Sequence, residues 1–199
     1  MKKKGGAFVD YWEKTVPWTF AEEKKTYRER RRLRYKLQDY MAEAIPFDSY
    51  HGKLILEVGS GSGIDSAEFG RKGAEVVSLD FTETGVHTTR DTLKEAGVRG
   101  SVIRAAAQAL PFRDHTFQCV YSFGVLHHIP EVDLPLAEVS RVLKRDCDFV
   151  GMVYNKNSLL YAYSILFLHK EEGLDEGDLV SRYSERVESC PYTDRKSVV

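Results

Sequence analysis

Apolar residues occur in short uninterrupted runs along this chain, and the runs alternate with stretches in which apolar positions recur every three or four residues. The clearest run is Leu54, Ile55, Leu56 and Val58, through which no polar alternation passes. A run of this kind is typical of a strand buried on both faces. The pattern predicts strands at 53–58, 75–79, 101–105, 117–122 and 149–154, and helices at 63 to about 72, about 83–96 and about 131–143, with a turn around Pro111.

Strands that alternate with helices predict a doubly wound, mostly parallel α/β sheet with helices on both faces. Ligands in such folds bind beyond the carboxyl ends of the strands. Gly59, Asp80, Ala107 and Ser122 all lie at these predicted ends. We therefore expect a ligand site at this edge of the sheet.

The two ends of the chain follow other patterns. Residues 1–19 are aromatic and irregular, and from about Phe20 to Ile45 an apolar face recurs at helical spacing, until Pro46 ends it. After Tyr154, the sequence is helical and then polar, with no run of strand-forming residues. The chain is thus divided into a cap (1–48), a ligand-binding domain (49–156) and a C-terminal extension (157–199).

Three glycines follow the first predicted strand at every second position, Gly59, Gly61 and Gly63. Glycine allows positive φ angles and lets a ligand approach the backbone closely. We expect Ser62 to be the N-cap of the next helix, with Asp65 as its capping-box partner. A glycine loop between a strand and a helix is the setting that binds nucleotide-like ligands, although a plain tight turn is the alternative.

Details of the loop separate two classes of ligand. A dinucleotide loop needs a third glycine where this chain has Ile64. Glu57, just ahead of the loop, opposes a pyrophosphate and suits a cationic or hydroxylated ligand. Asp80 ends the next strand, where a carboxylate can accept hydrogen bonds from a ribose diol; a helix cap is its alternative role. A nicotinamide-dependent oxidoreductase is therefore disfavoured.

Four segments in this order resemble the class I S-adenosylmethionine-dependent methyltransferases, most closely the ubiquinone/menaquinone-type "methyltransferase 11" branch. They are the glycine loop with Asp80, Ala107–Phe112, Phe117–Pro130 and Val139–Lys144, and the resemblance covers roughly residues 50–156. It implies an enzyme that uses S-adenosyl-L-methionine to methylate a small molecule. The cofactor-binding residues implied are Glu57, Gly59, Gly61, Asp80, Phe81, Ala107, Gln108 and Ser122. Among them, Glu57 would orient the methionine amino end, Asp80 would bind the ribose hydroxyls, and Phe81 would lie against the adenine.

The chain also departs from the family pattern. The family has Asp-Ala-Glu where this chain has Ala106-Ala107-Gln108, so the carboxylate that accepts from the adenine amino group is absent. Gln118 replaces a family Asp, and Arg145-Asp146-Cys147 replaces a Pro-Gly-Gly turn. The last two strands of the family also have no counterpart in the sequence after Tyr154. These departures leave open a degenerate or fragmentary non-catalytic S-adenosylmethionine-binding protein.

Methyl transfer needs a general base only when the acceptor is a poor nucleophile in its protonated form. His127 is the candidate base; the alternative is that it and His128 cap the strand or pack under the adenine. The acceptor pocket would be formed by His127, Asn155, the aromatic residues Tyr11, Trp12 and Trp18, and the helix near 160. No metal-ligand set is expected, because adjacent histidines rarely bind one ion and no cysteine is near.

Composition and charge add limits to this picture. The chain has 199 residues, a net charge of −1 and three cysteines without metal-type spacing, so we expect a cytoplasmic protein with reduced thiols. No signal peptide is apparent, and the apolar segment 159–168 is about half the length of a membrane-spanning helix.

Residues 24–36 carry eight basic side chains against Glu29 alone, which leaves an RNA methyltransferase as a further alternative to a solvated helix face. An uncovered sheet edge would require a partner or an oligomer.

Overall fold

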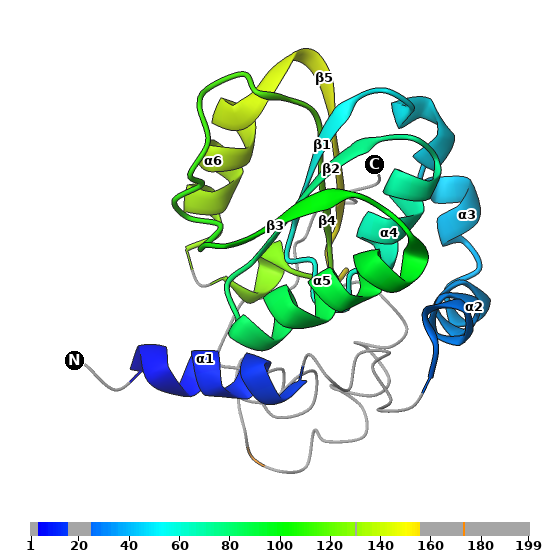
Figure 1. Ribbon diagram of the computed structural model, residues 1–199. Helices are drawn as coiled ribbons and strands as arrows, with labels where there is room; N and C mark the ends of the chain where they lie inside the picture. Colours follow the sequence, from blue (N-terminus) through cyan, green and yellow to red (C-terminus); the bar gives the residue numbers. More distant parts are fainter. Residues whose placement is uncertain (1–3, 16–24, 130, 156–172, 174–199) are drawn as a thin grey trace.

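The computed structural model describes residues 4–15, 25–129, 131–155 and 173. A five-stranded sheet lies at the centre with helices on both faces, and α1 lies beside α5 at one end of the molecule (Figure 1). The strand order is β3-β2-β1-β4-β5, and every pair of neighbouring strands is parallel. The predicted doubly wound parallel sheet is therefore confirmed.

The elements follow one another in the alternating order that the apolar pattern predicted. The strands are β1 (Leu54–Val58), β2 (Glu75–Asp80), β3 (Gly100–Arg104), β4 (Phe117–Phe123) and β5 (Leu143–Met152). The α-helices are α1 (Lys4–Thr15), α2 (Tyr27–Leu37), α3 (Met41–Ala44), α4 (Ile64–Arg71), α5 (Glu83–Ala96) and α6 (Asp133–Val142). The described residues also form the short 3-10 helices η2 (Phe47–Tyr50) and η3 (Leu126–His128).

The central strand β1 shows why its sequence is apolar throughout. Successive side chains of a strand point to opposite faces of the sheet, and here each face is covered. Ile55 belongs to one buried cluster with Phe69 of α4, whereas Leu56 belongs to a second buried cluster with Val139 of α6. Helices on both faces thus bury alternate residues of the strand, so both sets must be apolar.

The cap segment is more helical than its sequence pattern indicated. The expected irregular segment 1–19 contains the helix α1, and the single helix expected from about Phe20 to Ile45 is wrong. The described part of that stretch forms two helices, because Gln38 leaves the helical conformation at φ −128° and ψ 59°. The start of α2 is fixed by Thr26 and Glu29, which cap each other's backbone reciprocally.

Strand β5 begins six residues earlier than the predicted 149–154, at Leu143. Its pairing with β4 shifts register, since Phe117 lies opposite Leu143 and Cys119 lies opposite Asp148. The intervening residues form an irregular stretch in which Asp146 adopts a positive φ of 56°. An irregular, charged stretch of this kind has no strand periodicity, which explains why the sequence pattern missed it.

Two predictions fall on parts of the chain that the structure does not describe. One is the helix expected near 160, and the other is the expected lack of the last two family strands. Both concern residues 156–172 and 174–199, outside the described residues. Within the described ranges, no helix is long and apolar enough to cross a membrane.

Candidate functional site

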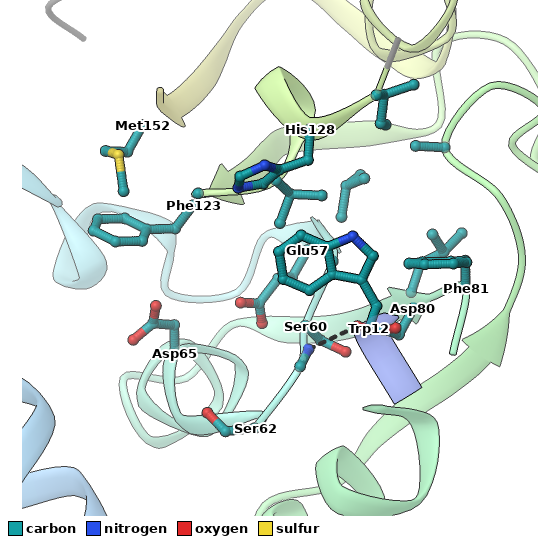
Figure 2. Close-up of a pocket in the computed structure, with 18 of the residues that line it drawn as sticks. Trp12, Glu57, Ser60, Ser62, Asp65, Asp80, Phe81, Phe123, His128 and Met152 are labelled. Carbon is teal, nitrogen blue, oxygen red and sulfur yellow. Dashed lines mark hydrogen bonds between the residues drawn. The ribbon is translucent and has the colours of Figure 1, made fainter. Parts of the chain in front are cut away.

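A cavity of about 430 Å³ opens at the carboxyl ends of the strands, where the topology predicted a ligand site. The glycine loop after β1, the end of β2, residues 105–108 and the end of β4 line it, and α1 and α2 contribute side chains from the cap (Figure 2). This volume lies within the range of small-molecule and cofactor sites, roughly 300–1,000 Å³. The cavity is therefore large enough to hold a nucleoside-sized ligand.

The glycine loop has the conformation that its sequence predicted. Gly59, Gly61 and Gly63 all adopt positive φ, at 78°, 49° and 70°. A Cβ on Gly59 would lie 2.4 Å from a methyl of Val125, whereas a Cβ on Gly61 would meet nothing within 4 Å. Gly59 therefore allows close packing against the segment after β4, and Gly61 keeps backbone open to the cavity.

The capping of α4 differs from the prediction. Gly63, in the left-handed conformation, occupies the N-cap position without any side-chain cap, so the assignment of Ser62 as N-cap is wrong. Instead, α5 holds the loop: Thr89 donates a hydrogen bond to the carbonyl of Gly61 at 3.2 Å, and Thr92 donates to the carbonyl of Ser62 at 2.7 Å. Two hydroxyl groups of α5 thus fix the loop that lines the cavity.

Asp65, the expected capping partner, forms the centre of a buried polar cluster at the cavity. Its carboxylate accepts hydrogen bonds from Arg34 Nε at 3.1 Å and Arg34 Nη2 at 2.5 Å. It also accepts from the hydroxyl groups of Tyr35 and Tyr121, each at 2.9 Å. Because α2 supplies Arg34 and Tyr35, this cluster joins the cap to the sheet beside the ligand cavity.

Glu57 lines the cavity, and the residue is only 3% exposed. Burial raises its pKa well above the ordinary value, and the negative charge of Asp65 raises the pKa further. A hydrogen bond from Ser66 and the charge of Arg34 act in the opposite direction. A cationic ligand beside Glu57 would relieve this unfavourable environment and would favour the ionised carboxylate.

Asp80 is also buried, and both of its carboxylate oxygens accept hydrogen bonds from the protein. Oδ2 accepts from the backbone N–H of Gly61 at 2.8 Å, and Oδ1 accepts from the N–H and the hydroxyl of Thr82 at 2.9 and 2.7 Å. An ionised carboxylate offers about four lone-pair positions, so Asp80 keeps about one for a ligand hydroxyl. The same side chain therefore fixes the glycine loop and presents an acceptor to the cavity that it lines.

Most of the other predicted site residues also line the cavity. Phe81 follows β2, and its backbone carbonyl accepts a hydrogen bond from Arg104 at 3.1 Å. Ala107 and Gln108 line the cavity together with Ala106, at the position where the family pattern has a carboxylate. At Ala106 the cavity wall therefore carries a methyl group, which cannot accept a hydrogen bond from an adenine amino group.

Ser122 and His127 lie beside the cavity without lining it. The Ser122 hydroxyl donates to the carbonyl of Val58 at 3.0 Å, so it links β4 to the end of β1. His127 is buried, and neither of its ring nitrogens has a hydrogen-bond partner. Burial, with a smaller contribution from the neighbouring His128, lowers the pKa of His127 to about 3. The roles predicted for these two residues toward a ligand stay predictions.

His128 is the histidine that reaches the cavity (Figure 2). Its ring lies 4.9 Å from that of Trp12 and 5.7 Å from that of Tyr154, between ring centroids. Phe123 and Met152 line the cavity near these rings, opposite the glycine loop in the view of Figure 2. The polar end of the cavity is thus faced by an apolar and aromatic wall.

Sequence reasoning did not identify Arg34 and Gln38 as cavity residues. The sequence signal for Arg34 was the basic tract 24–36, for which a solvated helix face was the favoured interpretation, and Gln38 lies outside that tract. The structure pairs three of the eight basic side chains of that tract with the protein's own acids: Arg30 with Glu95, Arg31 with Glu68, and Arg34 with Asp65. This pairing reduces the charge that the helix could offer to RNA phosphates.

The charges of the cavity favour one class of ligand. Glu57, Asp65 and Asp80 are buried carboxyl groups on its wall, and Arg34 is the buried cation that accompanies them. An excess of carboxyl groups attracts a cation and repels a pyrophosphate. Over the described ranges, no group of three or more His, Cys, Asp and Glu side chains could hold a metal ion. The site therefore fits a cationic nucleoside ligand better than a dinucleotide.

Comparison with known proteins adds a family to this geometry. The family model described as "Methyltransferase domain" matches residues 56–150. The demethylmenaquinone methyltransferase of Thermobifida fusca is 38% identical over 99 residues, which cover 49% of this chain and 42% of that protein. The ubiquinone/menaquinone biosynthesis C-methyltransferase of Haemophilus ducreyi is 34% identical over 157 residues, which cover 72% of this chain and 60% of that protein. The chain thus spans about half the length of these curated relatives.

A solved structure shares the fold. The crystal structure of a protein from Pyrococcus horikoshii superposes with a TM-score of 0.54 at 26% sequence identity. The superposition covers 70% of this chain and 64% of the other.

Proposed function

The chain belongs to the class I S-adenosylmethionine-dependent methyltransferases, and from this membership we propose that it transfers a methyl group from S-adenosyl-L-methionine to a small-molecule acceptor. The observation that carries the proposal is the meeting of the glycine loop with Glu57 and Asp80 at one cavity. The glycines provide approachable backbone, and the two carboxyl groups match a ligand that is cationic at one end and hydroxylated in the middle.

The residues that would hold the cofactor follow from this arrangement. Glu57 would face the methionine amino group and Asp80 would accept from a ribose hydroxyl, with Gly59 and Gly61 beside both. Phe81, Ala107 and Gln108 would contact the adenine, and Ser122 would support the site from β4. S-adenosyl-L-methionine supplies a methyl carbon that the positive sulfur has already activated. The protein's own contribution is to orient the two reactants and to keep water out.

The acceptor would lie against the aromatic and apolar wall of the cavity. Trp12, His128, Tyr154 and Met152 support this proposal, because they line the cavity and present rings and a thioether. We also propose Asn155 and the segment near 160 as parts of this pocket. An acceptor with an apolar or aromatic portion fits such a wall, and the relatives named for menaquinone and ubiquinone make a demethylated quinone the first candidate to try.

A general base, if the acceptor needs one, would come from the histidine pair. His127 is the proposed base, and its low pKa makes it neutral at pH 7 but a weak proton acceptor. His128 lines the cavity and lies 4.0 Å from His127 between ring centroids. Either histidine would serve a reactive acceptor mainly by positioning it, which agrees with a reaction driven by the cofactor's own positive charge.

The organisation of the chain is also part of the proposal. Residues 1–48 would form a cap, residues 49–156 the cofactor-binding domain, and residues 157–199 a C-terminal extension. We further propose a cytoplasmic location and a partner or second copy that covers the outer edge of β5. Nucleic acid is not expected as the substrate, because ion pairs within the protein already engage Arg30, Arg31 and Arg34.

Non-catalytic binding of S-adenosylmethionine is the second candidate, and Ala106 favours it. An exposed alanine stands where the family has an acceptor for the adenine amino group. A missing hydrogen bond to a buried donor costs roughly 1–3 kcal/mol, equivalent to a loss in affinity of about five- to 150-fold. Weak cofactor binding without turnover would follow if other contacts do not compensate.

Transfer of a labelled methyl group separates the two candidates. The purified chain is incubated with S-adenosylmethionine carrying a tritiated methyl group and with demethylmenaquinone, followed by a panel of small phenols and amines. Label that moves to an acceptor in the wild type, but not in Asp80→Ala, supports the enzyme. Label that stays on bound cofactor with every acceptor favours the non-catalytic protein.

A further inference from the structure

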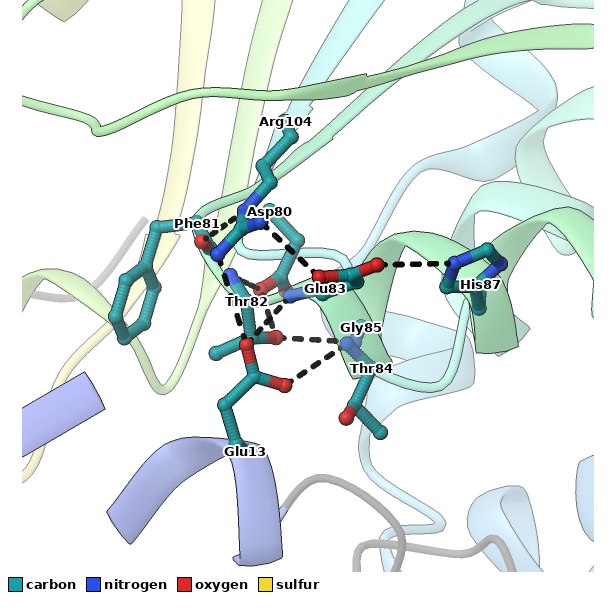
Figure 3. A network of polar contacts seen from close by, with 9 residues as sticks. All are labelled: Glu13, Asp80, Phe81, Thr82, Glu83, Thr84, Gly85, His87 and Arg104. Carbon is teal, nitrogen blue, oxygen red and sulfur yellow. Dashed lines mark hydrogen bonds and ion pairs between the residues drawn. The ribbon is translucent and has the colours of Figure 1, made fainter. Parts of the chain in front are cut away.

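Glu13 of α1 contacts the first turn of α5 (Figure 3). Its carboxylate accepts hydrogen bonds from the backbone N–H groups of Glu83 at 2.7 Å and Thr84 at 2.9 Å. Arg104 Nη2 lies 3.8 Å from the same carboxylate. These two N–H groups have no partner within the helix, because the first N–H groups of any helix lack one. A side chain from a distant segment thus provides the anionic partner that a helix N-terminus favours.

The opposite side of the same turn belongs to the ligand cavity. Thr82 caps α5 by accepting from the N–H of Gly85 at 3.0 Å, and it donates two hydrogen bonds to the cavity carboxylate of Asp80. Arg104 also donates to the backbone carbonyl of Phe81, which lines the cavity. The first turn of α5 therefore touches Asp80 on one side and Glu13 on the other (Figure 3).

The residue before Glu13 is a cavity residue. Trp12 lines the cavity, and Figure 2 shows its indole between Phe81 and His128. The ring centroids of Trp12 and His128 are 4.9 Å apart with an interplanar angle of 56°. Trp12 and Glu13 are adjacent in one helix. The contacts of Glu13 with α5 therefore restrain the position of the Trp12 indole in the cavity.

Resting on the cofactor site proposed above, we propose that Glu13 is a positioning residue that fastens α1 to the first turn of α5 and so holds Trp12 over the bound cofactor. Cofactor that occupies the cavity would contact both the Asp80 side of the turn and Trp12. Docking of α1 and binding of the cofactor would therefore favour each other, and this coupling must be reciprocal. The contact mainly slows the rate at which the cofactor leaves the cavity.

The ionisation of Glu13 agrees with this role. Partial burial opposes its charge, but the hydrogen bonds from Thr84 and Glu83 and the charge of Arg104 outweigh that effect, so the pKa of Glu13 is lowered. Glu13 is consequently charged at neutral pH, and charge-assisted hydrogen bonds are about twice as strong as neutral ones.

Trp12 provides a direct probe of this contact, because the chain has two tryptophans. In a Trp18→Phe background, the fluorescence of Trp12 is quenched with acrylamide, and the affinity and release rate of S-adenosylhomocysteine are measured by stopped flow. Glu13→Gln keeps the shape of the side chain but removes its charge. We expect it to make Trp12 more accessible to acrylamide and to raise the release rate about five- to tenfold, in line with the loss of the charge that strengthens these hydrogen bonds. Asp10→Asn, an exposed charge change on the same helix, is the matched control.

A second variant changes the other side of the contact. Glu83 is the first residue of α5 and follows Thr82, which has φ −85° and ψ 147°. Proline is tolerated at this position and after an extended residue, so Glu83→Pro removes one N–H donor while α5 stays helical. Glu83→Ala controls for the lost side chain. We expect Glu83→Pro to loosen Trp12 as Glu13→Gln does, and the double variant to add little, since both remove one interaction.

The outcomes separate this proposal from the function on which it rests. If ligand-free Glu13→Gln and Glu83→Pro show the wild-type quenching of Trp12, with an unchanged melting temperature, the proposed role of Glu13 is wrong even where the ligand binds. If the variants loosen Trp12 but no variant, including the wild type, binds S-adenosylhomocysteine, then the contact exists and the cofactor site is wrong. Equal release rates in a binding wild type and Glu13→Gln would also overturn the role.

Discussion

Arg34 of α2 and Asp65 of α4 form a two-bond ion pair on the wall of the ligand cavity, at 3.1 and 2.5 Å. Their side chains are 10% and 5% exposed, so water screens both charges only weakly. The pair therefore ties the cap to the sheet, and it also sets the charge that a ligand meets beside Glu57.

Removal of Arg34 should destabilise the protein strongly. Arg34→Met leaves Asp65 as a buried charge without its counter-ion, which costs about 3–5 kcal/mol of unfolding free energy. Arg32→Met, on an exposed position of the same helix, should change the free energy by less than about 0.5 kcal/mol. Urea unfolding at pH 7 measures both. Equal midpoints for the two variants would show that the pair contributes nothing to stability.

Two glycines of the loop should respond differently to alanine. Gly59→Ala places a Cβ 2.4 Å from Val125 at a φ of 78°, so it should destabilise the fold by roughly 1–3 kcal/mol through overpacking and strain. Gly61→Ala meets nothing within 4 Å, so its stability should fall less, by the cost of a positive φ alone, about 1 kcal/mol. Because Gly61 lines the cavity, its methyl group should instead weaken cofactor binding. Thermal unfolding and titration with S-adenosylhomocysteine on the same samples measure both effects. A larger loss of stability in Gly61→Ala than in Gly59→Ala would contradict the packing described for the loop.

The buried, neutral His127 should make stability fall in mild acid. Its folded-state pKa of about 3 lies below the ordinary value of 6.5, so the unfolded chain takes up the proton first as the pH drops. The contribution is complete above pH 6.5 and is lost toward pH 3, by about 1 kcal/mol per pH unit. His127→Phe should flatten the dependence of the unfolding free energy between pH 6.5 and 5. The exposed His87, changed to Asn, serves as the control and should leave the slope as it is.

Restoring a carboxylate at Ala106 should strengthen cofactor binding. Ala106→Asp returns the acceptor that the family pattern has at this position, and one hydrogen bond to a buried donor is worth roughly 1–3 kcal/mol. We expect the affinity for S-adenosylhomocysteine to rise about tenfold, with a smaller rise for Ala106→Asn, whose amide accepts without a charge. Calorimetric titration of the three proteins tests this. An affinity that falls in Ala106→Asp would mean that the adenine does not lie beside residue 106.

The sheet and the glycine loop could be predicted because their sequence signals are local. A buried strand such as β1 must be apolar on both faces, and a tight loop such as Gly59 to Gly63 needs positive φ, so both features appear directly in the residues. Strand β5 could not be placed, because its first half is charged and its register shifts beside Asp146. The helix α1 was missed, since its contact through Glu13 depends on residues 70 positions away.

The long-range members of the site were hidden for a similar reason. Arg34 lies in a basic tract whose pattern fits a solvated helix. Asp65 is 31 residues further along the chain, and only the fold brings the two side chains together. Asp65 itself was interpreted as a capping residue, because the sequence could not show that Gly63 would take the N-cap position. Between the two adjacent histidines, sequence favoured His127, whereas the orientation of η3 directs His128 to the cavity.

The central claim is that Glu57, the glycine loop and Asp80 form a site for S-adenosylmethionine, and calorimetric titration with S-adenosylhomocysteine tests it most directly. NADH serves as the ligand control, and the exposed Asp91→Ala as the matched variant beside Asp80→Ala. The account predicts micromolar binding of S-adenosylhomocysteine, on the order of −8 kcal/mol, and no binding of NADH. Asp91→Ala should keep this affinity and Asp80→Ala should lose it. A folded wild-type protein that binds NADH, or that binds neither ligand, would contradict it.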